Sequence, residues 1–239
     1  MSNQGRPTVT LLVLAMNEID GLREIMPRID RANVDQIIIA DGNSTDGTQE
    51  YARSMGYEVY PQVGKGGRNA FKTAAPHIKG DIVISFSPNG KSVPEIIPAL
   101  VAKMREGYDM VIVSRYKDAA RSADDTLISN FANKFFTTAI NFIYRANYTD
   151  SMVIYRAYWT RLFRELDLWP DKHYPLENMF RTIVSIEPLL SVRVAKRHLR
   201  VTEIPGDEPP RIGGVNKFPK VTGGLIYFVQ IIRELWHWK

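Results

Sequence analysis

The stretch IIIADGNSTDGT, residues 37–48, decides the fold class of this chain. Its first four residues are apolar and uncharged, which predicts a buried strand of a parallel sheet. The residues that follow build tight turns and cap a helix. Ligands of open α/β sheets bind at the carboxyl ends of the strands. Asp41 and Asp46 are therefore placed to accept hydrogen bonds from a base edge or a ribose hydroxyl, and the alternative is a plain turn in which Asp46 caps the helix.

Strand and helix patterns alternate on both sides of this stretch as far as residue 116. We expect strands over residues 9–15, 36–40, 58–60, 81–86 and 110–114. We expect helices over residues 20–32, 48–55, 68–77 and 94–105. Strands that alternate with helices of this length predict βαβ units, and therefore an α/β fold with a mostly parallel sheet flanked by helices.

The chain changes character after residue 116. Residues 117–125 are polar, and residues 126–144 follow a long amphipathic helical pattern. Short strands are expected over residues 152–155, 190–194 and 201–204, with a helix over residues 176–185. Residues 206–220 are rich in proline and glycine and predict a loop, and residues 221–238 predict a final amphipathic helix.

Composition bounds the function. The 239 residues contain 44% hydrophobic and 24% charged residues, as in an ordinary globular protein. The absence of cysteine excludes disulfides, thiolate metal sites and cysteine nucleophiles, and fits the cytoplasm. The net charge of +5 suits a nucleotide, another polyanion or an anionic membrane surface. The four histidines lack the spacing of metal ligands, and no phosphate-binding loop of kinases or dinucleotide enzymes is present.

Several segments resemble, in the same order, the family-2 glycosyltransferases of the GT-A fold. The resemblance is greatest to their polyprenyl-phosphate branch, the dolichol-phosphate mannose synthase type. It covers nearly the whole chain and depends on LVLAMNE (12–18), DGNSTDGT (41–48), KGGRNA (65–70), GDIV (80–83), SRY (114–116), residues 150–156 and RIGGVNK (211–217). Gly42 and Asn43 depart from the usual order of the second segment.

The resemblance implies a nucleotide-sugar donor site and places specific residues in it. Asp41 is expected against the base, and Asn17 and Glu18 beside the base or ribose, although the latter pair is also typical of a helix start. A mobile backbone near a cation suits a diphosphate, a role expected of the loop residues Lys65, Gly66 and Arg68. Asp81 and Ser87 complete the expected donor-binding set.

The metal motif of the family is altered in this chain. Its Asp-x-Asp, which would hold Mg²⁺ or Mn²⁺ against the diphosphate, aligns with Ser87-Pro88-Asn89. Because hard cations prefer carboxylate oxygens, we expect at most a weak metal site, with Asn89 as the remaining ligand. Lys91 is a candidate for the fixed positive charge in its place, and a surface lysine is the alternative. The missing carboxylates are also compatible with an inactive relative.

The acceptor side is expected to be basic. The resemblance places Arg115, Arg156, Arg211 and Lys217 near an acceptor phosphate, and guanidinium groups match phosphate geometry. A phosphate acceptor is already an anion near neutral pH, whereas a sugar hydroxyl needs a general base. The candidate bases are Glu177 and then Asp150, which is equally suited to orienting an arginine.

These observations predict one GT-A unit over residues 1–239, with a donor part (1–116), an acceptor part (117–220) and a terminal helix (221–239). The resemblance implies inverting transfer of a hexose to a polyprenyl phosphate or a cell-envelope glycan. Alternatives are transfer to a polysaccharide hydroxyl with Glu177 as base, and an inactive scaffold that binds a nucleotide sugar or a glycan. No nucleic-acid partner is expected.

The terminal helix raises the question of a membrane. Residues 221–238 are amphipathic and shorter than the roughly 20 apolar residues of a span. Tyr227, Trp236 and Trp238 are typical of a membrane interface, so we expect a cytoplasmic protein peripheral to the inner face of the membrane. The alternative is that this helix packs on the protein's own core or on a second copy.

Overall fold

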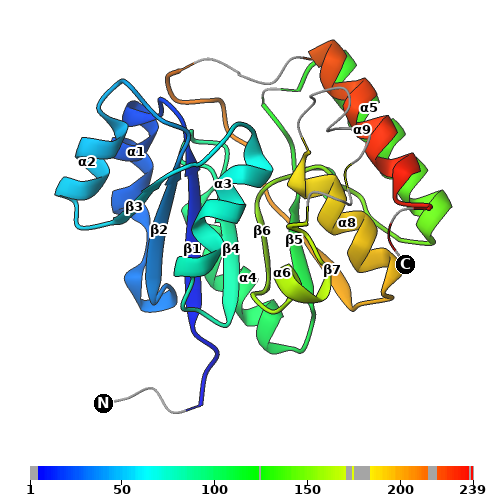
Figure 1. Cartoon of the computed structure of the whole chain (residues 1–239), viewed down its shortest axis with the longest axis horizontal. Helices are drawn as coiled ribbons and strands as arrows, with labels where there is room; N and C mark the ends of the chain where they lie inside the picture. The colour runs from blue at the N-terminus through cyan, green and yellow to red at the C-terminus, as the bar shows by residue number, and fades with distance from the viewer. Residues whose placement is uncertain are drawn as a thin grey trace.

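The computed structural model describes residues 5–123, 125–170, 174, 184–214, 220–236 and 238. Its centre is a seven-stranded sheet in the order β3-β2-β1-β4-β6-β5-β7 (Figure 1). The strands are β1 (Val9–Ala15), β2 (Gln36–Asp41), β3 (Glu58–Pro61), β4 (Ile82–Phe86), β5 (Met110–Ser114), β6 (Arg156–Trp159) and β7 (Val201–Pro205). β6 runs antiparallel to its neighbours β4 and β5, and the other pairs are parallel. The predicted mostly parallel sheet is confirmed.

Two layers of helices cover the sheet, because successive side chains of a strand point to opposite faces. Leu11 and Val13 of β1 pack with α1 (Ile19–Ile25), α2 (Thr48–Ser54) and α4 (Ile97–Arg105). Leu12 faces the other side, toward helices α3 (Gly67–Ala74), α5 (Leu127–Tyr144), α6 (Leu162–Glu165), α8 (Ile186–Lys196) and α9 (Lys220–Arg233). Both faces of the sheet are therefore buried.

The strand register brings the functional segments to one edge. Ala15 of β1 lies opposite Asp41 of β2, and Val13 lies opposite Phe86 of β4. The parallel strands β1, β2 and β4 thus end together, at the side of the sheet that lies away from the N-terminus in Figure 1. The ends of these strands and the turns that follow them carry the predicted donor residues Asn17, Glu18, Asp41 and Ser87.

Two strand predictions after residue 116 are wrong. The strand expected over residues 152–155 begins at Arg156, because the preceding residues form the turn into the sheet. The strand expected over residues 190–194 is part of helix α8, in which nine of eleven residues are buried. A helix that is buried on all sides lacks an amphipathic period, so its apolar run resembles a buried strand.

The remaining elements follow the predictions with shifted ends. The first helix ends at Ile25 and continues as short 3₁₀ turns that include Pro27, which cannot donate a helical hydrogen bond. Most of the helix expected over residues 176–185 lies outside the described residues. In the described part of the chain, no helix has the length and apolar character needed to cross a membrane.

Candidate active site

Asp41 ends β2 at the carboxyl edge of the sheet and is fully buried. Its Oδ1 accepts hydrogen bonds from Ser44 N (2.8 Å) and Gln49 Nε2 (2.7 Å), and its Oδ2 accepts one from Ser44 Oγ (2.5 Å). Asn43 occupies the left-handed region with a φ of 63°, which asparagine tolerates better than most side chains. This explains how the chain departs from the family order at Asn43 and still forms the turn.

The turn after β1 is joined to the turn after β2. Asn17 N donates to Ser44 Oγ (2.8 Å), and Asn17 Oδ1 accepts from Thr45 N (2.8 Å). Glu18 N donates to Thr48 Oγ1 (3.0 Å). The structure therefore brings Asn17, Glu18 and Asp41 together, as expected for residues of one donor site.

Asp46 organises the start of two helices. Its Oδ1 accepts from Thr48 N (3.0 Å) and its Oδ2 from Ile19 N (3.2 Å). Burial by itself would raise the pKa of the Asp46 carboxyl, but the hydrogen bonds from Thr48 and Ile19 lower it below its usual value. This geometry favours the capping alternative for Asp46.

The loop after β7 returns across the carboxyl edge to the first turn (Figure 1). Arg211 forms an ion pair with Glu18, and its Nε donates to Gly213 O (3.0 Å). Ile212 N donates to Asn89 O (2.8 Å). Arg211 and Ile212 thus connect the loop after β7 to the turns that follow β1 and β4.

The turn after β4 carries the altered metal motif. Ser87 N donates to Ser92 Oγ (3.2 Å), and Lys91 N donates to Asn89 Oδ1 (3.1 Å). A Cβ built on Gly21 would lie 2.3 Å from Pro88 O, so glycine is required where α1 passes this turn. Helix α1 and the turn are in direct backbone contact.

A line of ion pairs leads from this turn to the acceptor side. Lys91 Nζ lies 3.4 Å from Glu208 Oε1, and Glu208 Oε2 lies 3.2 Å from Arg115 Nη1 and accepts a hydrogen bond from Ser122 Oγ. Burial opposes the charge of Arg115, but Asp150 and Glu208 outweigh it and raise the pKa of the guanidinium. The two cations share Glu208.

Asp150 completes this line and is fully buried. It is held by Arg115 Nε (2.6 Å to Oδ2) and by Asn133 Nδ2 (3.0 Å to Oδ1). Burial alone would raise the pKa of Asp150, but the charge and hydrogen bonds of Arg115 lower it. This geometry favours the alternative in which Asp150 orients an arginine, here Arg115, over a general base.

The segment KGGRNA, residues 65–70, places one of its cations at the surface and the other in the core. Lys65 is exposed, and Gly66 has a φ of 89° at the start of α3. Arg68 points into the protein instead, where its Nε donates to Leu168 O (3.1 Å) and its guanidinium covers the ring of Tyr174. The placement fits a phosphate contact for Lys65 and a packing role for Arg68.

Two further predicted residues lie away from the edge. Asp81 precedes β4, at the opposite end of the strand from Ser87, and its Oδ2 accepts from Thr8 N (2.8 Å). Arg156 is 1% exposed within β6, where Nε donates to Val153 O (2.9 Å) and Nη1 to Ser191 Oγ (3.0 Å). Neither placement fits the donor role expected of Asp81 or the acceptor role expected of Arg156. Lys217 and Glu177 lie outside the described residues.

Sequence reasoning missed Glu208, which joins the two halves of the site. The residue sits in the segment DEPPR, residues 207–211, which we interpreted as a loop from its prolines. Its acidic pair, Asp207 and Glu208, lies two prolines before Arg211 of the predicted acceptor side, and that position was the available signal.

The residues at the altered motif do not fit a divalent cation. Ser87 and Asn89 carry no charge, and the Asn89 oxygen already accepts a hydrogen bond from Lys91 N. Within the ranges that the structure describes, no three histidine, cysteine, aspartate or glutamate side chains gather as a metal site. Hard cations require several oxygen ligands, usually with carboxylates among them.

Comparison with solved structures shows the same fold. Glucosyl-3-phosphoglycerate synthase from Mycobacterium tuberculosis, solved with Mn²⁺, uridine diphosphate and phosphoglyceric acid, superposes with a TM-score of 0.67 at 18% identity over 96% of this chain and 78% of that one. Mannosyl-3-phosphoglycerate synthase from Rubrobacter xylanophilus gives 0.67 at 17% identity over 96% and 74%. At this identity the likeness establishes the fold.

Comparison with curated sequences identifies relatives across the chain. Glycosyltransferase AglJ of Haloferax volcanii is 28% identical over 95% of this chain and 71% of its own length. An undecaprenyl-phosphate 4-deoxy-4-formamido-L-arabinose transferase of Klebsiella pneumoniae is 29% identical over 55% of this chain and 42% of its own length. A dolichol-phosphate mannosyltransferase of Pyrococcus furiosus is 28% identical over 45% and 33%. The chain therefore spans less than half of the latter two relatives, whose names support the polyprenyl-phosphate branch.

The sequence pattern of the family named Glycosyl transferase family 2 matches residues 10–167. The match includes the turns after β1, β2 and β4 and strand β5, which Arg115 directly follows. It confirms the family and the GT-A fold that the motifs predicted. The chain belongs to glycosyl transferase family 2.

Proposed function

We propose that this chain transfers a hexose, with inversion, from a nucleotide sugar to a polyprenyl phosphate or a cell-envelope glycan. The observation that supports it most is the continuous set of polar contacts along the carboxyl edge. Asp41, Asn17 and Glu18 lie at one end, and the cations Lys91 and Arg115 lie at the other. A nucleotide placed at the first end would direct its diphosphate toward the second.

The chemistry is a single displacement at the anomeric carbon. An acceptor oxygen forms a bond to this carbon while the bond to the diphosphate oxygen breaks, and the nucleoside diphosphate leaves with the electron pair. The leaving group gains negative charge in the transition state, so fixed positive charge beside it accelerates the step. Lys91 and the exposed Lys65 are the residues proposed for that role.

A phosphate acceptor suits this site better than a sugar hydroxyl. A phosphate monoester carries negative charge near neutral pH and gives up no proton, whereas a hydroxyl requires a general base. Asp150 and Glu208 are both ion-paired with Arg115, so their carboxylates already have a partner. Glu177 remains the candidate base for the alternative reaction on a polysaccharide hydroxyl.

The position of the apolar surface supports a lipid acceptor. The C-terminal helix α9 packs on α5 and α8, with Ile231 of the helix buried, and Trp238 after the helix is buried as well. Among the side chains that the structure describes, most of the exposed large apolar ones lie on α5, on α9 or in the turn after α9. We call this set the α5 apolar face: Leu127, Ile128, Phe131, Phe135, Phe142, Phe228, Leu235 and Trp236.

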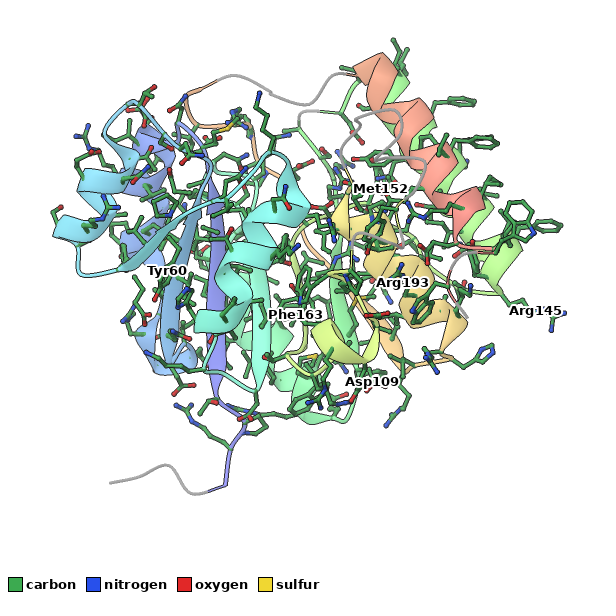
Figure 2. All side chains as sticks on the ribbon, in the orientation of Figure 1. Tyr60, Asp109, Arg145, Met152, Phe163 and Arg193 are labelled. Atoms are coloured by element: carbon green, nitrogen blue, oxygen red, sulfur yellow. The ribbon has the colours of Figure 1, made fainter. Side chains whose placement is uncertain are left out.

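We infer that the α5 apolar face rests on an anionic membrane surface. Aromatic side chains favour the lipid–water interface, and exposed apolar patches of this kind mark interaction surfaces. Lys134 and Arg145 supply exposed positive charge on or beside the same helix, and Arg145 lies at its outer end (Figure 2). Asn133 of α5 donates to Asp150, the ion-pair partner of Arg115, so a lipid phosphate near Arg115 would lie beside this helix.

A transfer assay tests the proposed function. Purified protein is incubated with radiolabelled UDP-glucose or GDP-mannose and undecaprenyl phosphate in detergent, and the organic phase is counted. We expect label in the lipid with one donor, loss of transfer in Asp41→Asn, and retention in Asp81→Asn at the opposite edge. Transfer to a soluble glycan that is lost in Glu177→Gln would favour the hydroxyl alternative. Nucleotide binding without any transfer would favour the scaffold.

A further inference from the structure

We propose, on the basis of the proposed function, that the ammonium group of Lys91 takes the place of a divalent cation at the donor diphosphate. Ser87 and Asn89 stand where the family pattern has aspartates, and Lys91 follows two residues later in the same turn. The chain has lost two negative charges and carries a positive one at this position. The replacement of the metal by a lysine gives a donor site that works without a metal.

The fold holds Lys91 in place. Gly90 adopts a φ of 88° and lets the turn close, while Asn89 Oδ1 accepts the hydrogen bond from Lys91 N (3.1 Å). The Lys91 side chain is 24% exposed and ends 3.4 Å from Glu208 Oε1. A lysine restrained in this way presents its charge from one direction, and it loses less side-chain freedom on binding a phosphate than a lysine on an open loop.

The charged side chains around Lys91 are already paired with one another. Glu208 and Asp150 balance Lys91 and Arg115, so the four side chains have no net charge. A divalent cation here would meet two cations and carboxylates that are already paired. A diphosphate would compete with Glu208 for Lys91, whose ammonium group is an effective point charge for phosphate.

The proposal predicts how affinity depends on the number of phosphates. If Lys91 contacts the second phosphate, UDP binds more tightly than UMP, and this preference survives the removal of metal. The ratio of the UDP and UMP affinities reports on the contact with the second phosphate alone. A general loss of folding or of base binding would weaken the binding of both nucleotides equally and leave the ratio unchanged. The same ratio for GDP and GMP covers a guanine-specific donor site.

Titration calorimetry of the full chain measures these ratios in EDTA and in Mn²⁺. We expect the diphosphate to bind at least about tenfold more tightly than the monophosphate in both conditions, the effect of one charge-assisted contact. Lys91→Met should reduce the ratio to near one, and Lys91→Arg should restore most of it. Lys103→Met is the matched control, because Lys103 also pairs with a glutamate, Glu106 (2.8 Å), at the end of α4.

A reciprocal variant restores the family pattern. Ser87→Asp/Asn89→Asp/Lys91→Met should bind the diphosphate in Mn²⁺ and lose it in EDTA. Diphosphate binding by the unaltered chain that requires Mn²⁺ would overturn the proposal and leave the proposed function standing. An unchanged ratio in Lys91→Met would also overturn it. No binding of either nucleotide pair in either condition would contradict the proposed function itself.

Discussion

Arg211 is ion-paired with Glu18, although 193 positions separate the two residues in the chain. The pair joins the loop after the last strand to the turn after the first one. Both side chains are largely buried, at 17% and 7% exposed. The loop after β7 therefore covers the predicted donor side of the sheet's carboxyl edge. A poorly solvated ion pair holds it there.

The Glu18–Arg211 pair should contribute to both stability and donor affinity. Removal of one partner leaves the other charge poorly solvated, so Glu18→Gln and Arg211→Met should each lower the melting temperature. A double-mutant cycle on the free energy of unfolding should give a coupling of about 1–3 kcal/mol, as for contacting pairs. The single variants should also bind UDP or GDP more weakly than the unaltered chain. A coupling near zero would show that the pair does not hold the loop.

Gly21 should be intolerant of a side chain. A Cβ at this position would lie 2.3 Å from Pro88 O and 3.1 Å from Asn89 Cα, so Gly21→Ala must displace the turn that carries Lys91. We expect a loss of about 1–3 kcal/mol in urea denaturation, as for overpacking, and weaker nucleotide binding. Gly67→Ala is the matched control, since a Cβ there has nothing within 4 Å. Equal effects of both changes would refute the close packing of α1 on the turn.

The regular part of the fold was predictable because local pattern and tertiary environment agree there. Residues 37–40 are apolar in sequence and fully covered in the sheet, so their pattern predicted the observed strand. Helix α8 is buried on all sides and includes the buried Arg193, so its apolar residues do not follow the helical period. The strand that we predicted there is therefore wrong. Arg156 illustrates the same limit in β6, because a charged residue inside a sheet is satisfied by carbonyl groups that no local pattern indicates.

The donor half of the site was predictable for a related reason. Asp41 and Asn17 belong to short motifs in adjacent turns, and the sheet register alone brings them together. Glu208 depends on a loop that returns from the other end of the chain, so its contacts with Lys91 and Arg115 could not be inferred from spacing. The orientation of Arg68 toward Tyr174 is likewise a consequence of packing between distant segments.

Glu234 should govern part of the acid stability. Its carboxylate pairs with Arg193 Nε (2.8 Å) and Arg233 Nη2 (2.7 Å), and all three side chains are buried. Burial would raise the pKa of Glu234, but the two arginines lower it below its usual value of 4.5. The stabilisation is therefore fully present above the unfolded pKa and is lost as the pH falls through the folded pKa.

The lowered pKa of Glu234 predicts how its replacement changes stability and acid sensitivity. Glu234→Gln removes the carboxylate that pairs with two buried guanidinium groups, and we expect a loss of about 3 kcal/mol in the free energy of unfolding at pH 7. Its melting temperature should also fall less than that of the unaltered chain as the pH drops below 4.5, because the stabilisation by the ionised Glu234 is lost only as the pH falls through its lowered folded pKa. Glu106→Gln, in an exposed pair with Lys103, is the control and should change neither quantity much. An acid limb that is as steep in Glu234→Gln as in the unaltered chain would contradict the assignment.

The α5 apolar face should decide membrane binding. Phe131 and Phe142 are 72% and 85% exposed on one side of α5, so their replacement should cost little folding free energy. We expect Phe131→Ser/Phe142→Ser to float less with vesicles of phosphatidylglycerol and phosphatidylcholine, and to keep transfer to a detergent-solubilised acceptor. Val63→Ser removes a similarly exposed apolar side chain, 79% exposed, on a loop outside this face and should float normally. If the unaltered chain does not float, and the double variant instead converts a dimer to a monomer in light scattering, the face joins two copies of the chain rather than a membrane.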